Sequence, residues 1–185
     1  MRFSTKKDLR EKVKTLLRSQ EEEKRLEKSL LIKNKLFNMD VFHRASNILF
    51  YASFDGEVDT FDMIISSIKL GKTVGLPVIK KDSTQLLPRI IHSFERDLEK
   101  GPYGIKQPKI NPENEMKTID LVIVPGIVFD KRNYRIGRGA GFYDRFLSTL
   151  SDKIYTLGLA FDFQIIERFP QIDQHDVPVK HVLTN

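Results

Sequence analysis

The sequence predicts an α/β fold, and three observations point to it. Apolar segments rich in β-forming residues alternate with segments of helical spacing along most of the chain. Residues 120–129 (DLVIVPGIVF) are apolar almost throughout, which is typical of a central strand buried on both faces of a parallel sheet. The chain has 185 residues and 40% hydrophobic content, which suits one core and is short for two ordinary domains. We therefore expect a single three-layer domain over residues 1–185, with an open, mainly parallel sheet and helices on both faces.

Residues 6–39 predict two helices. Ser19, followed by Glu22 three residues later, is a capping-box pattern that predicts the start of the second helix. The charged run EEEKRLEK is interpreted as a solvent-facing surface with paired charges. The apolar residues at helical spacing are Leu9, Val13, Leu16 and Leu17 in the first helix and Leu26, Leu30 and Leu31 in the second.

Strands and helices are then predicted to alternate to the end of the chain. The first strand is expected over residues 45–53, and the helix after it, over residues 59–71, is closed by Gly71. A turn-rich loop is expected over residues 101–117. Further strands are expected over residues 73–79, 86–91, 120–129, 155–161 and 181–185, and further helices over residues 93–101, 141–150 and 163–169.

Composition narrows the chemistry. The chain has no cysteine, which excludes disulfides, thiol nucleophiles and thiolate metal sites. Its four histidines are scattered without the spacing of a zinc motif, and magnesium bound through carboxylates and phosphates remains open. The histidines are His43, His92, His175 and His181.

The net charge and the hydropathy of the chain indicate which partners it could bind and where in the cell it is expected. The formal net charge of +6 favours anionic partners but does not choose among nucleic acid, an anionic membrane and polyanionic metabolites. No apolar run approaches the roughly 20 residues that a membrane-spanning helix needs. The N-terminal segment also lacks the apolar stretch of a secretory signal, so we expect a cytoplasmic protein.

The strongest local motif is a glycine-rich loop that runs into a predicted helix at residues 135–145 (RIGRGAGFYDR). Alternating glycines let backbone N–H groups converge on an anion, and arginines grip phosphate oxygens in pairs. An aspartate directly after the glycines suits a magnesium ion that bridges those phosphates. The alternative is a turn whose glycines only relieve backbone strain, and the spacing is neither a Rossmann fingerprint nor a Walker loop. The residues concerned are Gly137, Gly139 and Gly141, with Arg135, Arg138, Arg145 and Asp144.

Two other carboxylates are candidates for the same site. Glu57 lies in a loop after the first predicted strand, where ligands of open α/β sheets usually bind. It could accept hydrogen bonds from the ring N–H and amino groups of a heterocyclic substrate, or it could simply favour the start of the next helix. Asp176 lies in a polar loop before the last strand and gains a role only if that loop folds back beside the glycine-rich loop.

Taken together, these segments resemble the 5-formyltetrahydrofolate cyclo-ligase family, in order over nearly the whole chain. The most specific feature is the pair formed by PG-x-x-FD at residues 125–130 and RxGxGxGxYD at residues 135–144. Gln107 stands where the family usually has glutamate before proline, and Phe142 stands where tyrosine is usual, so no role is carried over to either side chain.

The resemblance implies an ATP- and magnesium-dependent ligase that converts 5-formyltetrahydrofolate to 5,10-methenyltetrahydrofolate and releases ADP and phosphate. The formyl oxygen would be phosphorylated by ATP, and N10 would then close the ring as phosphate leaves. Residue by residue, the resemblance implies ATP binding by Lys6, Arg10, Arg135, Ile136, Gly137, Arg138, Gly139, Ala140, Gly141, Phe142 and Tyr143, and folate binding by Ala52, Glu57, Arg138, Gly139, Ala140, Gly141 and Phe142. It implies magnesium binding by Asp144 and Asp176, and catalytic roles for Arg138 and Arg145.

Two rival functions predict sequence features that this chain lacks. A nucleic-acid-binding module would interleave aromatic and basic residues on one face, whereas most of the 13 phenylalanines lie in apolar strands and helices. A kinase or nucleotide-binding switch would carry a Walker loop or a catalytic Asp–Asn pair. We therefore expect a monomer that acts on 5-formyltetrahydrofolate and ATP, with neither nucleic acid nor a membrane as a partner.

Overall fold

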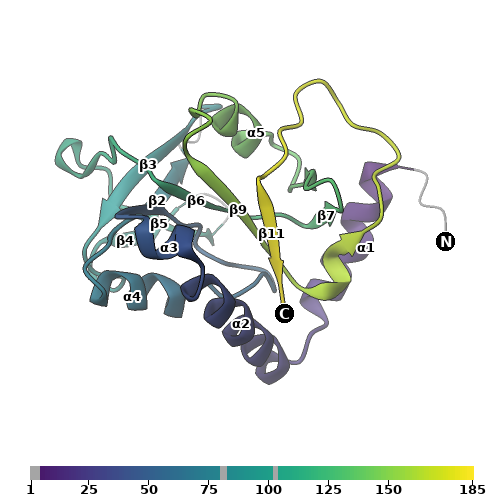
Figure 1. Cartoon of the computed structure of the whole chain (residues 1–185), viewed down its shortest axis with the longest axis horizontal. Helices are drawn as coiled ribbons and strands as arrows, with labels where there is room; N and C mark the ends of the chain where they lie inside the picture. The colour runs from purple at the N-terminus through teal and green to yellow at the C-terminus, as the bar shows by residue number, and fades with distance from the viewer. Residues whose placement is uncertain (1–4, 80–82, 102–103) are drawn as a thin grey trace.

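A six-stranded sheet forms the middle of the molecule in the computed structural model, which describes residues 5–79, 83–101 and 104–185 (Figure 1). Its strand order is β11-β9-β6-β1-β2-β3, and every neighbouring pair is parallel except β2 and β3. A mainly parallel sheet with an antiparallel edge strand is a common form of the α/β fold, so the predicted sheet is confirmed. The strands are β1 (Asn47–Leu49), β2 (Thr73–Ile79), β3 (Leu86–Ile91), β6 (Leu121–Val124), β9 (Tyr155–Ala160) and β11 (His181–Thr184).

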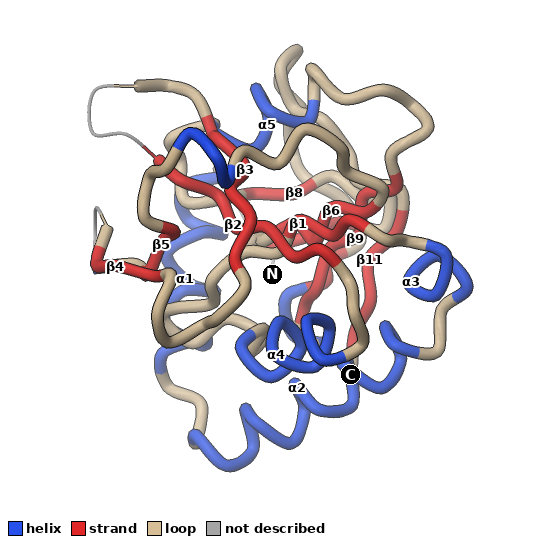
Figure 2. The backbone as a smooth tube through the Cα atoms, turned by 90° about the vertical axis from the view of Figure 1, so that its left-hand side faces the viewer, coloured by secondary structure: helices blue, strands red, loops and turns tan. Residues whose placement is uncertain are grey.

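Helices cover both faces of this sheet, but unequally. Figure 2 shows α2 and α4 on one side of the strands and α5 on the other. The larger hydrophobic cluster takes residues from α1, α2, α3 and α4, and the smaller cluster takes Leu147 from α5. The helices are α1 (Lys6–Arg18), α2 (Glu22–Phe37), α3 (Asp40–Arg44), α4 (Phe61–Lys69) and α5 (Phe142–Leu147). The short helix α3 was not expected from the sequence.

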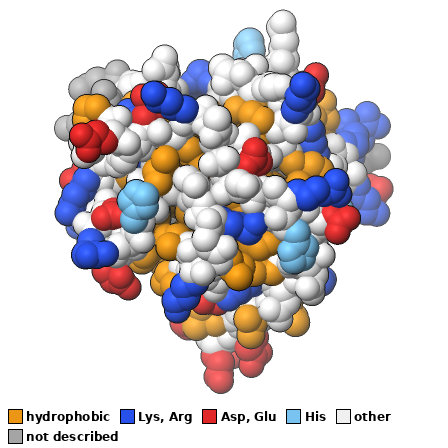
Figure 3. All heavy atoms as spheres, turned by 60° about the vertical axis from the view of Figure 1, so that its left-hand side comes forward, with side chains coloured by type: hydrophobic (Ala, Val, Ile, Leu, Met, Phe, Trp, Pro, Cys, Tyr) orange, Lys and Arg blue, Asp and Glu red, His pale blue; other side chains and the backbone are white. Residues whose placement is uncertain are grey.

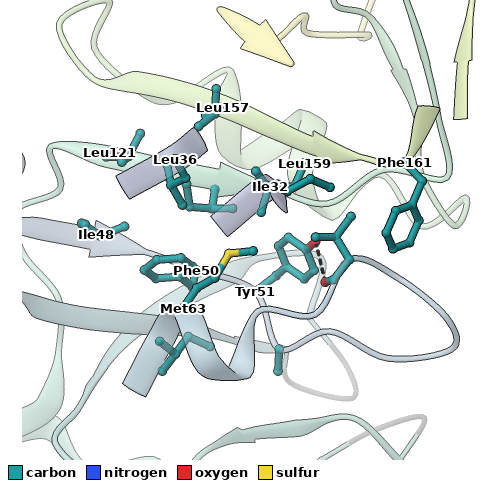
Figure 4. Packing of buried hydrophobic residues seen from close by; sticks show 14 of the residues in the cluster. Ile32, Leu36, Ile48, Phe50, Tyr51, Met63, Leu121, Leu157, Leu159 and Phe161 are labelled. Atoms are coloured by element: carbon teal, nitrogen blue, oxygen red, sulfur yellow. Dashed lines mark hydrogen bonds between the residues drawn. The ribbon is translucent and has the colours of Figure 1, made fainter. Parts of the chain in front are cut away.

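The alternation of side chains along each strand divides the core between the two faces. In β1, Ile48 belongs to the larger cluster and Leu49 to the smaller one, and both are fully buried. The same alternation separates Leu121 from Val122 in β6. Figure 4 shows part of the larger cluster, where residues of α2 and α4 pack against the strands. The residues labelled there are Ile32, Leu36, Ile48, Phe50, Tyr51, Met63, Leu121, Leu157, Leu159 and Phe161.

The apolar run at residues 120–129 is two strands and not the one strand that was expected. After β6 the chain turns at Pro125 and Gly126 and continues as β7 (Val128–Asp130) in a second, three-stranded sheet. There β7 pairs with β8 (Arg135–Ile136) and β10 (Ile165–Ile166). Proline has no N–H to donate to a ladder, which favours a break at this point.

A buried side chain satisfies the backbone at this break. The amide nitrogen of Gln164 donates to the carbonyl oxygens of Gly126 at 2.9 Å and Ile127 at 3.0 Å. Its oxygen accepts from the Phe161 N–H at 2.7 Å, and the residue is 1% exposed. Gln164 ends the 3₁₀ turn η3 (Asp162–Gln164), and β10 follows it, so the helix expected over residues 163–169 is wrong. Competition from these side chain to backbone bonds explains the error.

The helix expected over residues 93–101 is also wrong. The Asp97 carboxylate accepts from the backbone N–H groups of His92 at 2.7 Å and Ser93 at 2.8 Å, which closes a turn. The chain then forms a hairpin of β4 (Leu98–Lys100) and β5 (Lys106–Pro108). The loop expected over residues 101–117 therefore contains β5 and the 3₁₀ turn η2 (Pro112–Asn114), while residues 102–103 lie outside the described residues.

The start of α2 differs from the prediction. Ser19 is the C-cap of α1, and its hydroxyl donates to the Leu16 carbonyl at 3.1 Å. The N-cap of α2 is Glu21, whose side chain makes no capping bond. By contrast, Gly71 ends α4 with φ of +79°, as expected.

The buried face of α2 also differs from the prediction. The face toward the sheet carries Ser29, Ile32 and Leu36. The leucines at helical spacing that predicted the buried face lie on another side of the helix, so spacing alone predicted the wrong face. The exposed leucines of α2 are Leu26, Leu30 and Leu31, each close to half exposed. Among the described residues, no helix is long and apolar enough to cross a bilayer.

We predict that Gln164→Leu lowers the free energy of unfolding by about 3 kcal/mol, because three buried backbone groups lose their partner and each costs about 1–3 kcal/mol when left unsatisfied. Urea unfolding followed by circular dichroism measures the change. The exposed Gln85 provides the control, since Gln85→Leu should change the free energy of unfolding by less than about 0.5 kcal/mol. Equal stability of the two variants would contradict the assigned role of Gln164.

Candidate active site

One large cavity, of about 750 Å³, opens beyond the carboxyl ends of β1, β2 and β6. The strand order reverses between β1 and β6, which is where open α/β sheets usually bind ligands. Its volume suits an organic ligand of substantial size. The structure brings all the predicted site residues into the wall of this cavity: Lys6, Arg10, Ala52, Glu57, Arg135, Ile136, Gly137, Arg138, Gly139, Ala140, Gly141, Phe142, Tyr143, Asp144, Arg145 and Asp176.

The glycine-rich loop connects β8 to α5 and lies under the N-terminal helix. Arg10, one turn into α1, donates from Nε to the Gly137 carbonyl at 2.8 Å. Gly139 and Gly141 have φ of +111° and +67°, a region that L side chains rarely adopt, so both positions favour glycine. The helix α5 is shorter than the one expected over residues 141–150.

Arg135 and the hydroxyl of Tyr143 are buried next to this loop. The Arg135 side chain is 3% exposed, and its Nη2 donates to Asp144 Oδ1 at 2.9 Å. Within the described part of the chain, Arg135 Nε and the Tyr143 hydroxyl have no hydrogen-bond partner. Burial raises the pKa of Tyr143, so its hydroxyl stays protonated and able to donate at neutral pH. Buried polar atoms without a partner in a cavity wall indicate that a ligand supplies one.

Arg138 reaches across the cavity to the loop that follows β1. Its Nε and Nη2 both donate to Glu57 Oε1, at 3.2 and 2.9 Å, and its Nη1 donates to Asp55 Oδ2 at 3.0 Å. The guanidinium lies 3.6 Å from the centre of the Phe54 ring. Burial raises the pKa of Glu57, and the charge and hydrogen bonds of Arg138 oppose that rise.

The segment that carries Asp176 does fold back beside the glycine-rich loop. Lys6 of α1 pairs with Asp176 and, at 2.6 Å, with Asp173. The neighbouring Val177 N–H donates to Asp144 Oδ1 at 3.5 Å, which brings the two predicted metal ligands to one region. Although burial opposes it, hydrogen bonds to both aspartates raise the pKa of Lys6.

Arg145, the second arginine predicted to be catalytic, is held by backbone carbonyls. Its Nε donates to Thr84 O at 2.9 Å and its Nη2 to Ala140 O at 2.8 Å. It also lies 5.4 Å from the centre of the Phe142 ring. These two hydrogen bonds hold the guanidinium in the cavity wall.

Several cavity residues were missed in the sequence. The residues after β6 could have been found, because the carboxyl end of a central parallel strand is the expected ligand edge. Gln107 could not, because its place depends on the unpredicted β4–β5 hairpin, where its Oε1 accepts from the Ile79 N–H at 3.4 Å. The missed residues are Tyr51, Phe54, Pro77, Ile79, Ile105, Lys106, Gln107, Pro125, Gly126, Ile127, Asp173 and His175.

Comparison with known proteins agrees with this fold and site. The model of the 5-formyltetrahydrofolate cyclo-ligase family matches residues 2–185. Proteins named 5-formyltetrahydrofolate cyclo-ligase are 34% identical in Mus musculus, over 97% of this chain and 93% of that protein, and 34% identical in Haemophilus influenzae, over 76% of each.

Solved structures give the same result. The 5,10-methenyltetrahydrofolate synthetase of Aquifex aeolicus superposes with a TM-score of 0.80 and 32% identity, over 97% of this chain and 89% of that one. The synthetase of Mycoplasma pneumoniae has a TM-score of 0.77, over 96% and 97% of the two chains, and at 21% identity it supports the fold alone. The family match over nearly the whole sequence, together with the relatives that share a third of its residues, means that this chain belongs to the 5-formyltetrahydrofolate cyclo-ligase family.

Proposed function

We propose that this protein is a ligase that converts 5-formyltetrahydrofolate to 5,10-methenyltetrahydrofolate at the expense of ATP. The observation that carries the proposal is the single cavity in which a glycine-rich loop, four arginines and Glu57 meet, in a chain of this family. The formyl oxygen attacks the γ-phosphorus and the bond to ADP breaks. N10 then attacks the activated formyl carbon, loses its proton, and phosphate leaves with the former formyl oxygen.

We assign the ATP phosphates to the side of the cavity between α1 and the glycine-rich loop. Lys6, Arg10 and residues 135–143 would hold the nucleotide there. Phosphoryl transfer needs positioning and neutralisation of spreading negative charge, and it needs no protein nucleophile. Arg138 and Arg145 border the glycine-rich loop and are our candidates for stabilising that charge in the transition state.

We assign the folate to the side of the cavity that faces the loop after β1. Glu57 is 6% exposed, and its carboxylate is positioned to accept hydrogen bonds from a pterin ring and its amino group. Ala52 and residues 138–142 would contact the same substrate, so the glycine-rich loop would lie between the two reactants.

We assign magnesium to Asp144 and Asp176. No group of three or more potential ligand side chains is assembled among the described residues. The donor set nevertheless suits magnesium, which takes one or two carboxylates and completes its shell with substrate phosphates and water. Both carboxylates line the cavity beside the glycine-rich loop, where such phosphates would lie. When bound, the ion would neutralise phosphate charge. Without ligands, Arg135 and Lys6 hold the two carboxylates in place.

We further propose that the protein works as a cytoplasmic monomer and takes neither nucleic acid nor a membrane as a partner. ATP and a folate are both anionic, so two small substrates account for the net charge of +6. Figure 3 shows a face on which acidic and basic side chains are interspersed around hydrophobic ones, unlike a continuous basic surface for a phosphate backbone.

We predict that the purified protein forms methenyltetrahydrofolate when mixed with 5-formyltetrahydrofolate, ATP and magnesium, because the cavity unites the groups for both substrates. The absorbance of the product measures the reaction, with ATP omitted in the control. A flat trace from folded protein that binds ATP would mean that the substrate assignment is wrong.

We predict that Arg138→Ala lowers kcat and leaves KM for both substrates nearly unchanged, because its charge is needed most in the transition state. Asp144→Ala should instead raise the magnesium concentration that gives half-maximal rate. Arg44→Ala is the control, because Arg44 lies far out in solvent and pairs only weakly with Asp40 at 3.4 Å. Wild-type rates in both site variants would overturn the assignment.

We predict that Tyr143→Phe lowers kcat/KM about tenfold without lowering thermal stability, since the hydroxyl lost has no partner in the described protein. Steady-state kinetics and thermal unfolding give the two readouts. Tyr155→Phe is the control, because Tyr155 lies in β9 and outside the cavity wall. Loss of stability without loss of activity in Tyr143→Phe would show that the hydroxyl is structural.

A further inference from the structure

Asp55 joins two arginines that come from distant parts of the chain. Its Oδ1 accepts from Arg18 Nε at 2.7 Å, and its Oδ2 accepts from Arg18 Nη2 at 2.9 Å and Arg138 Nη1 at 3.0 Å. Asp55 does not belong to the wall of the large cavity, and it lies behind Arg138 beside a smaller one. It can therefore act on the reaction only through its neighbours.

The backbone at Asp55 is fixed independently of Arg138. Asp55 has φ of +56° and Gly56 has φ of +82°, and a Cβ at Gly56 would lie 2.2 Å from the Leu17 carbonyl oxygen at the end of α1. The Gln20 amide ties the two segments by donating to the carbonyls of Leu17 and Gly56, both at 3.0 Å. A turn held this closely against α1 keeps the carboxylate in one place, and a positive φ at aspartate marks a conformation that its surroundings impose.

Glu57 and Asp55 bind different edges of the Arg138 guanidinium. Glu57 accepts from Nε and Nη2, whereas Asp55 accepts from Nη1. A pterin that donates to both oxygens of the Glu57 carboxylate competes with Arg138 for Oε1. The bond from Nη1 to Asp55 is not involved in that competition, so Arg138 can keep this charged contact when the substrate is bound. Its other contacts outside Glu57 are uncharged, namely the Phe54 ring at 3.6 Å and the Phe54 carbonyl at 3.4 Å.

We propose that Asp55 is a positioning residue, which holds the Arg138 guanidinium beside the two substrates once the pterin has taken Glu57. The inference rests on the proposed function for the identity of the ligand at Glu57. Arg18 supports it, because its two hydrogen bonds fix the orientation of the Asp55 carboxylate from the solvent side.

Kinetics with a double-mutant cycle test this role. Asp55→Asn keeps the shape of the side chain and removes its charge, and it should lower kcat about tenfold with KM for 5-formyltetrahydrofolate nearly unchanged, as expected for loss of one charged hydrogen bond. In the Arg138→Ala background the same change should have no further effect, because Asp55 acts through Arg138. Equal losses in both backgrounds, or wild-type kinetics in Asp55→Asn, would overturn the proposal.

A matched control comes from the same loop. Asp59 pairs with Arg25 of α2 at 3.4 Å and accepts from the Phe61 N–H at the start of α4 at 2.9 Å, and none of these bonds involves Arg138. The effect of Asp59→Asn should therefore be the same with and without Arg138. A coupling to Arg138 as large as that of Asp55 would mean that the cycle reports general loop stability, which also overturns the proposal.

A second measurement needs no substrate, and it separates this proposal from the proposed function. Glu57→Gln removes the charge that attracts Arg138 at this position, and so mimics a Glu57 whose carboxylate is already bound to a substrate. In that variant the Arg138 Nε–H should remain ordered by nuclear magnetic relaxation, and adding Asp55→Asn should make it mobile. If Arg138 stays equally ordered in the double variant, Asp55 is not its anchor, whatever reaction the protein catalyses.

Discussion

Where a buried strand ends, its backbone N–H and C=O groups still need hydrogen-bond partners, because no water reaches them. Gln164 supplies these partners where the chain passes from the main sheet to the small one. The small sheet depends on this passage, because β7 begins directly after it. Pairing of β7 with β8 then sets the position of Arg135 and the first residues of the glycine-rich loop. Gln164, which lies outside the cavity wall, thus helps to position Arg135 and the glycine-rich loop.

The opposite side of the site depends on α1. Arg10 binds the glycine-rich loop, Lys6 binds the C-terminal segment, and Arg18 binds the turn after β1. All three contacts come from one helix, whose Leu9, Val13 and Leu17 are buried in the core. A helix anchored by its apolar residues therefore orders three loops that are far apart in the sequence.

The sequence allowed prediction of the sheet and of the glycine-rich part of the site, because both depend on local patterns, whereas Lys6, Arg10 and Ala52 were predicted from the family resemblance. Strand alternation and apolar runs mark β2 and β3 at their observed bounds, and glycines with arginines mark the loop at residues 135–145. The errors arose where distant contacts override local preference. Gln164 and Asp97 bind backbone groups and replace two expected helices. Leu26, Leu30 and Leu31 of α2 are exposed because the sheet contacts another face of that helix. Pairs between distant residues, such as Asp55 and Arg138, leave no pattern in the sequence from which they could be predicted.

The charged groups assigned to ligands already have partners inside the protein, as Arg135 has Asp144, Lys6 has Asp176 and Arg138 has Glu57. Binding is therefore an exchange of partners, and its free energy is the difference between new and old pairs. A small anion such as free phosphate would disrupt these pairs and replace few of them. A nucleotide and a folate together can replace several at once. Under the proposed assignment, these internal pairs would favour ligands that replace several of them at once, in a cavity lined by side chains of both charges.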